Sequence, residues 1–165
     1  MEDASERIRR WAKAGEDTAL PDWNELPTIP LYMDQVIFYL GENLRFFERD
    51  GQSSLLTSSM INNYVKTGVL PHPEKKKYRR EHLAALLAVC MLKQVLSIQD
   101  IKTLLAGEEL SEELYNLFLT THTAALQETC VTLAENCDTG ENLKQKALRL
   151  AIEAYACLLY TSPSP

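Results

Sequence analysis

Cysteine and long apolar runs are scarce in this sequence of 165 residues. Four cysteines are too few for a disulfide scaffold in a chain of this length. No apolar run approaches the roughly 18 residues that a membrane-spanning helix needs, and the first residues lack the apolar core of a signal peptide. These absences predict a cytoplasmic, soluble domain that does not enter a membrane.

Patterns that carry catalytic or cofactor chemistry are also missing. The three histidines, His72, His82 and His122, have no partners at a recognisable spacing. Cys130 and Cys137 lie seven residues apart without a CxxC pair or a Cys/His cluster, which argues against zinc. There is no GxGxxG, phosphate loop, nucleophile elbow or HExxH. We therefore expect no enzyme activity, no cofactor and no metal.

What is present is the composition and periodicity of a helical globular domain. Hydrophobic residues make up 45% and charged residues 24%, which is ordinary for a chain that buries a core. Apolar residues recur every three or four positions, and no segment alternates in the manner of a strand. The pattern predicts an all-α, mainly helical fold with helices at about 32–47, 57–68, 80–95, 97–105, 111–135 and from 139 onward.

Local signals place the ends of these helices. Three prolines between Leu20 and Pro30 exclude a helix there and predict an extended segment packed against the body. One residue of Thr57-Ser58-Ser59 is expected to cap the second helix, and Gly68 to end it. Ser97 and Asp100 have the spacing of a capping box, and Gly107 is expected to end the helix that they open.

The net charge of −6 is unevenly distributed. Between Thr57 and Lys102 lie eight basic and three acidic residues, a local charge of +5, whereas Thr103–Leu143 contains eight acids and no Lys or Arg. A compact basic cluster is the electrostatic pattern expected for phosphate contact. Taken alone, Lys75-Lys76-Lys77 could equally be a solvated turn.

The order of motifs across Leu56–Leu105 resembles the DNA-binding domain of MerR-type regulators. In that family a helix-turn-helix is followed by a Gly-Leu-Pro exit, a basic wing ending in Tyr, and two further helices. Here the exit is Gly68-Val69-Leu70-Pro71 and the wing ends at Lys77-Tyr78-Arg79. The usual Arg-Tyr pair of the second helix is replaced by Asn62-Asn63, which puts sequence preference and affinity in doubt. The resemblance implies a winged helix-turn-helix with a C-terminal helical extension.

A closer resemblance, over roughly residues 20–105, is to a bacterial family known as domain of unknown function 1836. It is carried by four short motifs and implies a fold without an established activity. The motifs are Leu20-Pro21-Asp22-Trp23, Leu31-Tyr32-Met33-Asp34-Gln35, Ser59-Met60-Ile61-Asn62-Asn63-Tyr64 and Leu92-Lys93-Gln94-Val95-Leu96-Ser97.

The resemblance to MerR-type proteins implies a DNA-binding surface on the second helix and the wing. Serine hydroxyls and the helix N-terminus suit phosphate, asparagine can read adenine, and lysine and arginine can contact the backbone. Six basic contacts would give a salt slope of about −5. Ordinary capping and polar surface are the competing interpretation. The expected residues are Ser58, Ser59, Asn62, Asn63, Tyr64, Lys66, Lys75, Lys76, Lys77, Tyr78, Arg79 and Arg80.

Four segments are expected along the chain. Residues 1–19 form a flexible N-terminal segment or a short helix, 20–106 the MerR-like domain, and 107–156 a helical extension. Residues 157–165 resemble the translated read-through of a sequencing adapter, so we expect the natural chain to continue beyond Ala156. The extension would either form a homodimer or pack back onto the same domain.

The function expected from these features is DNA binding in transcriptional regulation, with double-stranded DNA as the partner. A two-fold regulator would match two half-sites. The sequence does not indicate an effector. The alternative is a helical protein–protein interaction module on the same scaffold, without DNA binding.

Overall fold

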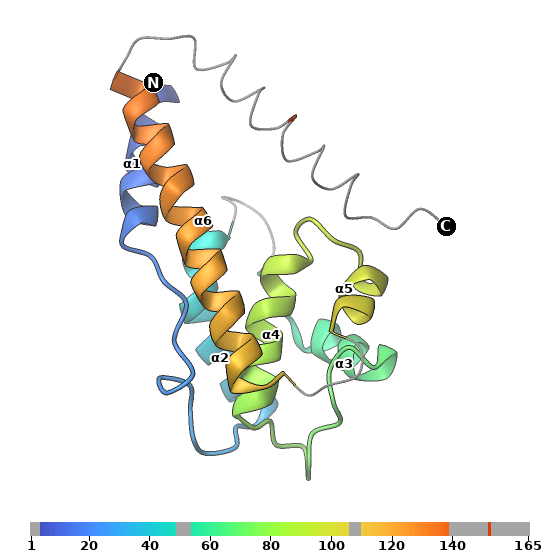
Figure 1. Cartoon of the computed structure of the whole chain (residues 1–165). Coiled ribbons are helices and arrows are strands. Elements are labelled where there is room, and N and C mark those ends of the chain that lie inside the picture. The colour runs from blue at the N-terminus through green and yellow to red at the C-terminus, as the bar shows by residue number, and fades with distance from the viewer. Residues whose placement is uncertain (1–3, 49–53, 106–109, 139–151, 153–165) are drawn as a thin grey trace. The chain divides into compact units, whose positions relative to one another are not determined.

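A computed structural model describes residues 4–48, 54–105, 110–138 and 152, and within these ranges the chain is mainly helical, as predicted (Figure 1). A 3-10 turn, η1 (Arg45–Phe47), follows directly after α2 (Met33–Leu44). The described residues form no strand, only two isolated β-bridges. The predicted end at Gly107, the helix from 139 onward and residues 157–165 lie outside the described residues. The α-helices are α1 (Ala4–Glu16), α2 (Met33–Leu44), α3 (Ser58–Thr67), α4 (Arg80–Leu92), α5 (Ile98–Leu104) and α6 (Glu112–Asp138).

The chain divides into two compact units, one made of residues 1–18 and 122–165 and the other of residues 19–121. The first contains α1, so the helical alternative for the N-terminal segment is the one that the structure adopts. The division falls after residue 121 rather than at the expected boundary after 106. The reason is that Leu110, just before α6, and Tyr115, in the first turn of α6, belong to the core of the second unit.

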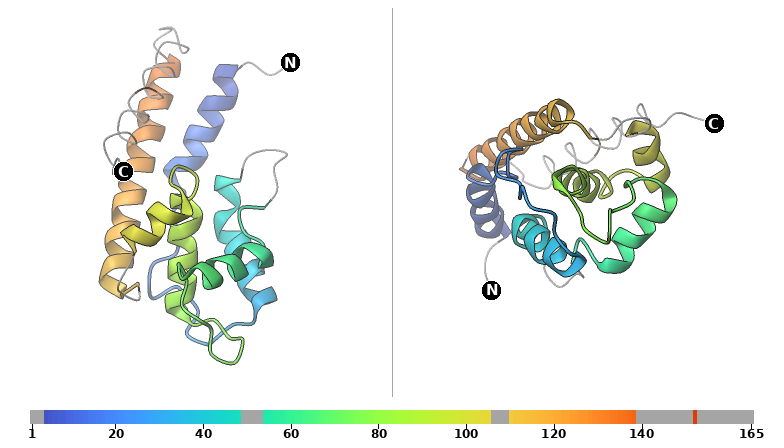
Figure 2. Two further views of the ribbon diagram at one scale, coloured as in Figure 1. Left: turned by 90° about the vertical axis from the view of Figure 1, so that its right-hand side faces the viewer. Right: turned by 90° about the horizontal axis from the view of Figure 1, so that it is seen from below.

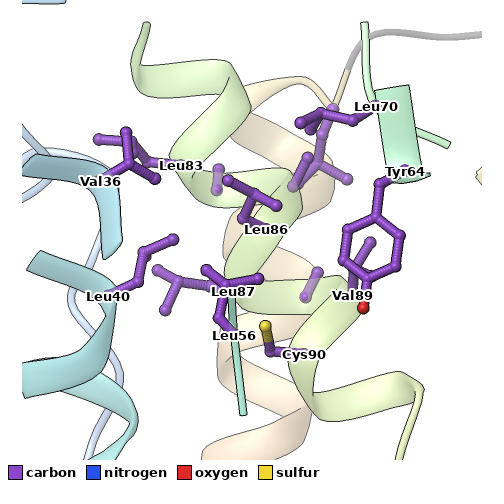
Figure 3. Close-up of a cluster of buried hydrophobic side chains, with 14 of the residues drawn as sticks. Val36, Leu40, Leu56, Tyr64, Leu70, Leu83, Leu86, Leu87, Val89 and Cys90 are labelled. Carbon is purple, nitrogen blue, oxygen red and sulfur yellow. The ribbon is translucent and has the colours of Figure 1, made fainter. Parts of the chain in front are cut away.

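Helix α4 is the centre of the second unit. Its residues from His82 to Met91 are all buried, which is the pattern of a helix surrounded by other elements rather than lying on a surface. The buried residues Val36 and Leu40 of α2 face Leu83 and Leu87 of α4 (Figure 3). On another side of α4 lie α3 and α5 (Figures 1 and 2). The core is therefore built outward from α4.

The proline-rich segment before α2 contains no helix and packs on this core, as predicted, but it is not extended throughout, because the Glu25 and Leu26 amides donate to the Asp22 carbonyl and form a turn. Leu20, Trp23 and Leu26 are buried, and the Trp23 ring lies 6.1 Å from the ring of Tyr115. The Tyr115 hydroxyl donates a hydrogen bond of 2.7 Å to the carbonyl of Pro21. Burial raises the pKa of Tyr115, which keeps this hydroxyl protonated.

The predicted capping signals are confirmed. The Thr57 hydroxyl accepts a 3.3 Å hydrogen bond from the Met60 amide at the start of α3, and Gly68 ends this helix with φ +75°. Ser97 and Asp100 form the capping box of α5. Helix α4 ends at Leu92, three residues earlier than predicted, because a turn over 93–95 follows it.

Candidate functional site

A two-residue hairpin with lysines at its tip connects the loop after α3 to α4. The Lys77 amide donates a 2.9 Å hydrogen bond to the Glu74 carbonyl, and Lys75 and Lys76 between them have φ of +50° and +63°. Positive φ at both central residues is the conformation of a type I′ turn, which favours Asn and Gly. Each lysine there adopts a conformation that costs roughly 1–2 kcal/mol for a residue with a side chain. The chain thus keeps two lysines at a position where they are unfavourable for stability.

The base of this hairpin is fixed to the core. Leu31 and Tyr78 exchange two backbone hydrogen bonds of 2.8 Å, which ties the segment before α2 to the end of the hairpin. The Lys77 ammonium lies 5.1 Å above the centre of the Tyr32 ring, a cation–π arrangement. Lys75 and Lys76 are exposed at the tip, and the connection between α3 and α4 projects past the N-terminal end of α4 (Figures 1 and 2).

Helix α3 buries one face and exposes the other. Ile61 and Tyr64 are buried, which follows from the 3–4 spacing of its apolar residues. The exposed face carries only small polar residues and one lysine: Ser58, Ser59, Asn62, Asn63 and Lys66. All five had been predicted from the sequence as contact residues, and the structure brings them together on one surface.

Between α3 and the hairpin lies an open groove of about 630 Å³, called here the α3–hairpin groove. It has a lysine from each wall, because α3 supplies Lys66 and the hairpin supplies Lys76. Its lining is Met33, Asn62, Val65, Lys66, His72, Pro73, Lys76 and Tyr78. Four residues of this lining were not predicted as contact residues, because the groove brings together segments that are distant in the sequence: Met33, Val65, His72 and Pro73.

A second depression of about 500 Å³ lies on the other side of α3, next to the start of α5. Ser59 and Asn63 border it from α3, and Ser97 borders it from the cap of α5. The Lys93 ammonium at this place donates a 2.6 Å hydrogen bond to the Leu55 carbonyl. Burial lowers the pKa of Lys93 from its usual value.

Two of the predicted contact residues are largely buried in the core. Tyr64 and Tyr78 are each 3% exposed, although Tyr64 also borders the second depression and Tyr78 the α3–hairpin groove. Burial raises the pKa of Tyr64 to about 12. An aromatic residue beside a basic segment gives no sequence signal that separates these two roles.

Two predicted arginines are engaged within the protein. The Arg80 guanidinium lies 5.7 Å from the Trp23 ring centre and donates a 3.1 Å hydrogen bond to the Leu26 carbonyl. Arg79 forms an ion pair with Glu74 at the base of the hairpin. Together with Lys77, they position the hairpin. Arg79 stays exposed in its ion pair, and Lys66, Lys75 and Lys76 are the exposed lysines of the predicted set.

The described residues offer few other kinds of site. In these ranges no three His, Cys, Asp or Glu side chains gather closely enough to hold a metal ion. None of the described helices is both long enough and apolar enough to cross a bilayer. Cys90 on α4 is fully buried, and burial raises its pKa to about 11.

The fold and this surface define a small helical domain with a lysine-tipped hairpin beside an exposed polar helix face. A family model described as "Domain of unknown function (DUF1836)" matches residues 21–122, and the chain belongs to this family. The matched range coincides closely with the unit of residues 19–121. Neither a curated protein nor a solved structure matches the chain significantly.

Proposed function

We propose that this protein binds double-stranded DNA through α3 and the lysine-tipped hairpin and acts as a transcriptional regulator. The observation that carries the proposal is the pair of left-handed lysines at the hairpin tip, next to an exposed helix face of Ser, Asn and Lys. A conformation that is unfavourable for stability at two adjacent residues suggests a function for their side chains. Positively charged groups beside a polar helix suit a phosphate backbone.

The arrangement also supports the MerR-like winged helix-turn-helix interpretation. Along the chain, α2 and α3 are followed by a short hairpin and then by α4 and α5, the order of elements in that domain. Val69 and Leu70 after Gly68 are buried, so the exit from α3 leads the chain into the core before the hairpin. In this interpretation α3 is the recognition helix and the hairpin is a shortened wing.

The electrostatic contribution is smaller than the sequence alone suggested. Arg79, Arg80 and Lys77 make contacts within the protein, which leaves three exposed lysines for phosphates. Each phosphate contact contributes about −0.9 to the slope of log affinity against log salt. We therefore propose a slope of about −3, in place of the slope of about −5 expected from the sequence alone.

A salt series tests this proposal. Binding of the full chain to random-sequence duplex DNA is measured by fluorescence anisotropy from low to moderate salt. The pair Lys75→Gln and Lys76→Gln should reduce the slope by about 2, one contact for each charge removed. The charge-matched control, Arg7→Gln with Lys13→Gln, removes two exposed charges of α1 and should leave the slope unchanged. Binding that is absent at low salt would refute the proposal.

A protein-binding module without DNA binding is the second candidate, and it is favoured by α6. Leu117 on this helix is 64% exposed, and Leu114 is also exposed. The helix contains no Lys or Arg and begins with Glu112 and Glu113. An apolar and acidic surface suits a protein partner, including a second copy of the chain. Mass measurement of the full chain, repeated with Leu117→Glu, separates self-association from a monomer.

A further inference from the structure

We propose that the α3–hairpin groove holds one sugar–phosphate strand of the duplex, so that Asn62 contacts the backbone and Asn63 reads base edges. The assignment rests on the proposed DNA binding and goes beyond it. It separates two adjacent asparagines that the sequence could only treat as equivalent. Asn63 becomes the residue that determines sequence preference.

The two asparagines lie on opposite flanks of the exposed face of α3. Consecutive residues of an α-helix point about 100° apart. Asn62 therefore borders the α3–hairpin groove with Lys66, and Asn63 borders the second depression with Ser59. Both side chains are exposed, and neither side-chain amide makes a hydrogen bond to another residue in the described part of the chain. Each is therefore free to bind a different part of a ligand.

The charges assign the anionic strand to the Asn62 side. In the groove, Lys66 and Lys76 approach from opposite walls, so an anion between them would be attracted by both. On the Asn63 side, the Lys93 ammonium is held by the Leu55 carbonyl at 2.6 Å. The lining of the groove thus carries two lysines and that of the second depression one, so a polyanionic strand is stabilised more in the groove than in the second depression.

The apolar part of the lining also fits a sugar–phosphate strand. Met33, Val65 and Pro73 line the groove between the two lysines. A nucleic-acid backbone alternates charged phosphates with deoxyribose, whose carbon atoms pack on apolar surface. A site for a free small anion would need only the polar groups. The mixed lining therefore favours a continuous strand.

With the strand in the groove, α3 would present Asn63 to the base edges beyond it. The asparagine amide can bond adenine through two hydrogen bonds in the major groove, a pairing worth about 1–3 kcal/mol of discrimination. This amounts to a preference of roughly 5- to 150-fold for one base pair. Asn62 would instead donate to a phosphate oxygen, which carries no sequence information.

The strand is located by a duplex in which one phosphate at a time is replaced by neutral methylphosphonate. Each substitution is tested with the unchanged full chain, with Lys66→Gln and with Lys76→Gln. The two variants should lose sensitivity at the same or adjacent phosphates of one strand. Lys13→Gln in α1 is the control and should keep the full pattern. Loss of sensitivity on two different strands would overturn the inference.

The asparagines are distinguished by selection from a randomised duplex library. Asn62→Ala should weaken binding by a similar factor on every sequence, and Asn63→Ala should flatten the preference at one or two positions. The reverse result, or a uniform effect of both variants, overturns the inference while DNA binding itself stands. Failure of the unchanged chain to bind any duplex at low salt overturns both.

Discussion

The hairpin tip offers a test in which stability and DNA binding should change in opposite directions. Replacing Lys75 by Asn and Lys76 by Gly gives the pair of residues that a type I′ turn favours. Glycine removes the left-handed cost of roughly 1–2 kcal/mol at one position, and asparagine removes part of it at the other. The greater freedom of glycine in the unfolded chain offsets roughly 0.4–1 kcal/mol. The net expected gain is about 1 kcal/mol.

If the protein binds DNA as proposed, the same change removes two phosphate contacts. A contact that adds about −0.9 to the salt slope contributes about one order of magnitude to affinity at 0.1 M relative to 1 M salt. Two contacts therefore correspond to a loss of about 60-fold at 0.1 M salt. A gain of 1 kcal/mol would raise the melting temperature by about 2–4 °C for a chain of this length.

The assays are thermal unfolding and anisotropy with a labelled duplex, performed on the same preparations. The matched control, Lys75→Gln with Lys76→Gln, removes the charges without relieving the backbone, so it should lose affinity and gain no stability. An Asn-Gly variant that binds DNA as tightly as the unchanged chain would refute the functional reading of the hairpin. An Asn-Gly variant that is less stable than the unchanged chain would refute the argument that the two lysines are in an unfavourable conformation.

Four further substitutions test the fold that supports this surface. Gly68→Ala should destabilise the fold by about 1–2 kcal/mol, because residue 68 has φ +75°. Gly41→Ala inside α2, where an added Cβ meets nothing within 4 Å, should stabilise the fold by about 0.5–1 kcal/mol. Equal effects of the two substitutions in urea unfolding would contradict this comparison. Tyr115→Phe removes the hydrogen bond to Pro21 and should cost about 1 kcal/mol, and a neutral result would mean that water replaces the bond. Because burial raises the pKa of Cys90 from 9.0 to about 11, the unfolded state ionises first as pH rises, so stability is retained below pH 9 and is lost between 9 and 11. Cys90→Ala should reduce this loss of stability relative to the unchanged chain. An identical dependence of stability on pH in the two chains would refute the assignment of the loss to Cys90.

Local signals in the sequence predicted most of the helical framework. Thr57, Gly68 and the Ser97–Asp100 pair were read correctly because a cap depends on a few consecutive residues. The absence of a helix over Leu20–Pro30 was predicted because proline restricts the backbone wherever it occurs, whereas the turn that begins at Asp22 was not. These features need no knowledge of distant neighbours.

The roles of the basic and aromatic residues depended on distant contacts and could not be predicted. Arg80 looks like a member of a basic cluster in the sequence, but Trp23 and Leu26, more than fifty positions earlier, engage its guanidinium. Tyr78 is buried in the core, and its backbone pairs with Leu31, which is distant in the sequence. The type I′ conformation was also not predicted, because two lysines are contrary to the usual preference of that turn.

The exposed face of α3 also has a consequence for how this family can diverge. Asn62 and Asn63 are exposed and contribute nothing to the core around α4. Substitutions at such positions usually change stability by less than about 0.5 kcal/mol. This face can therefore vary almost independently of folding. Under the proposed DNA binding, related chains would acquire new target sequences without first acquiring compensating mutations.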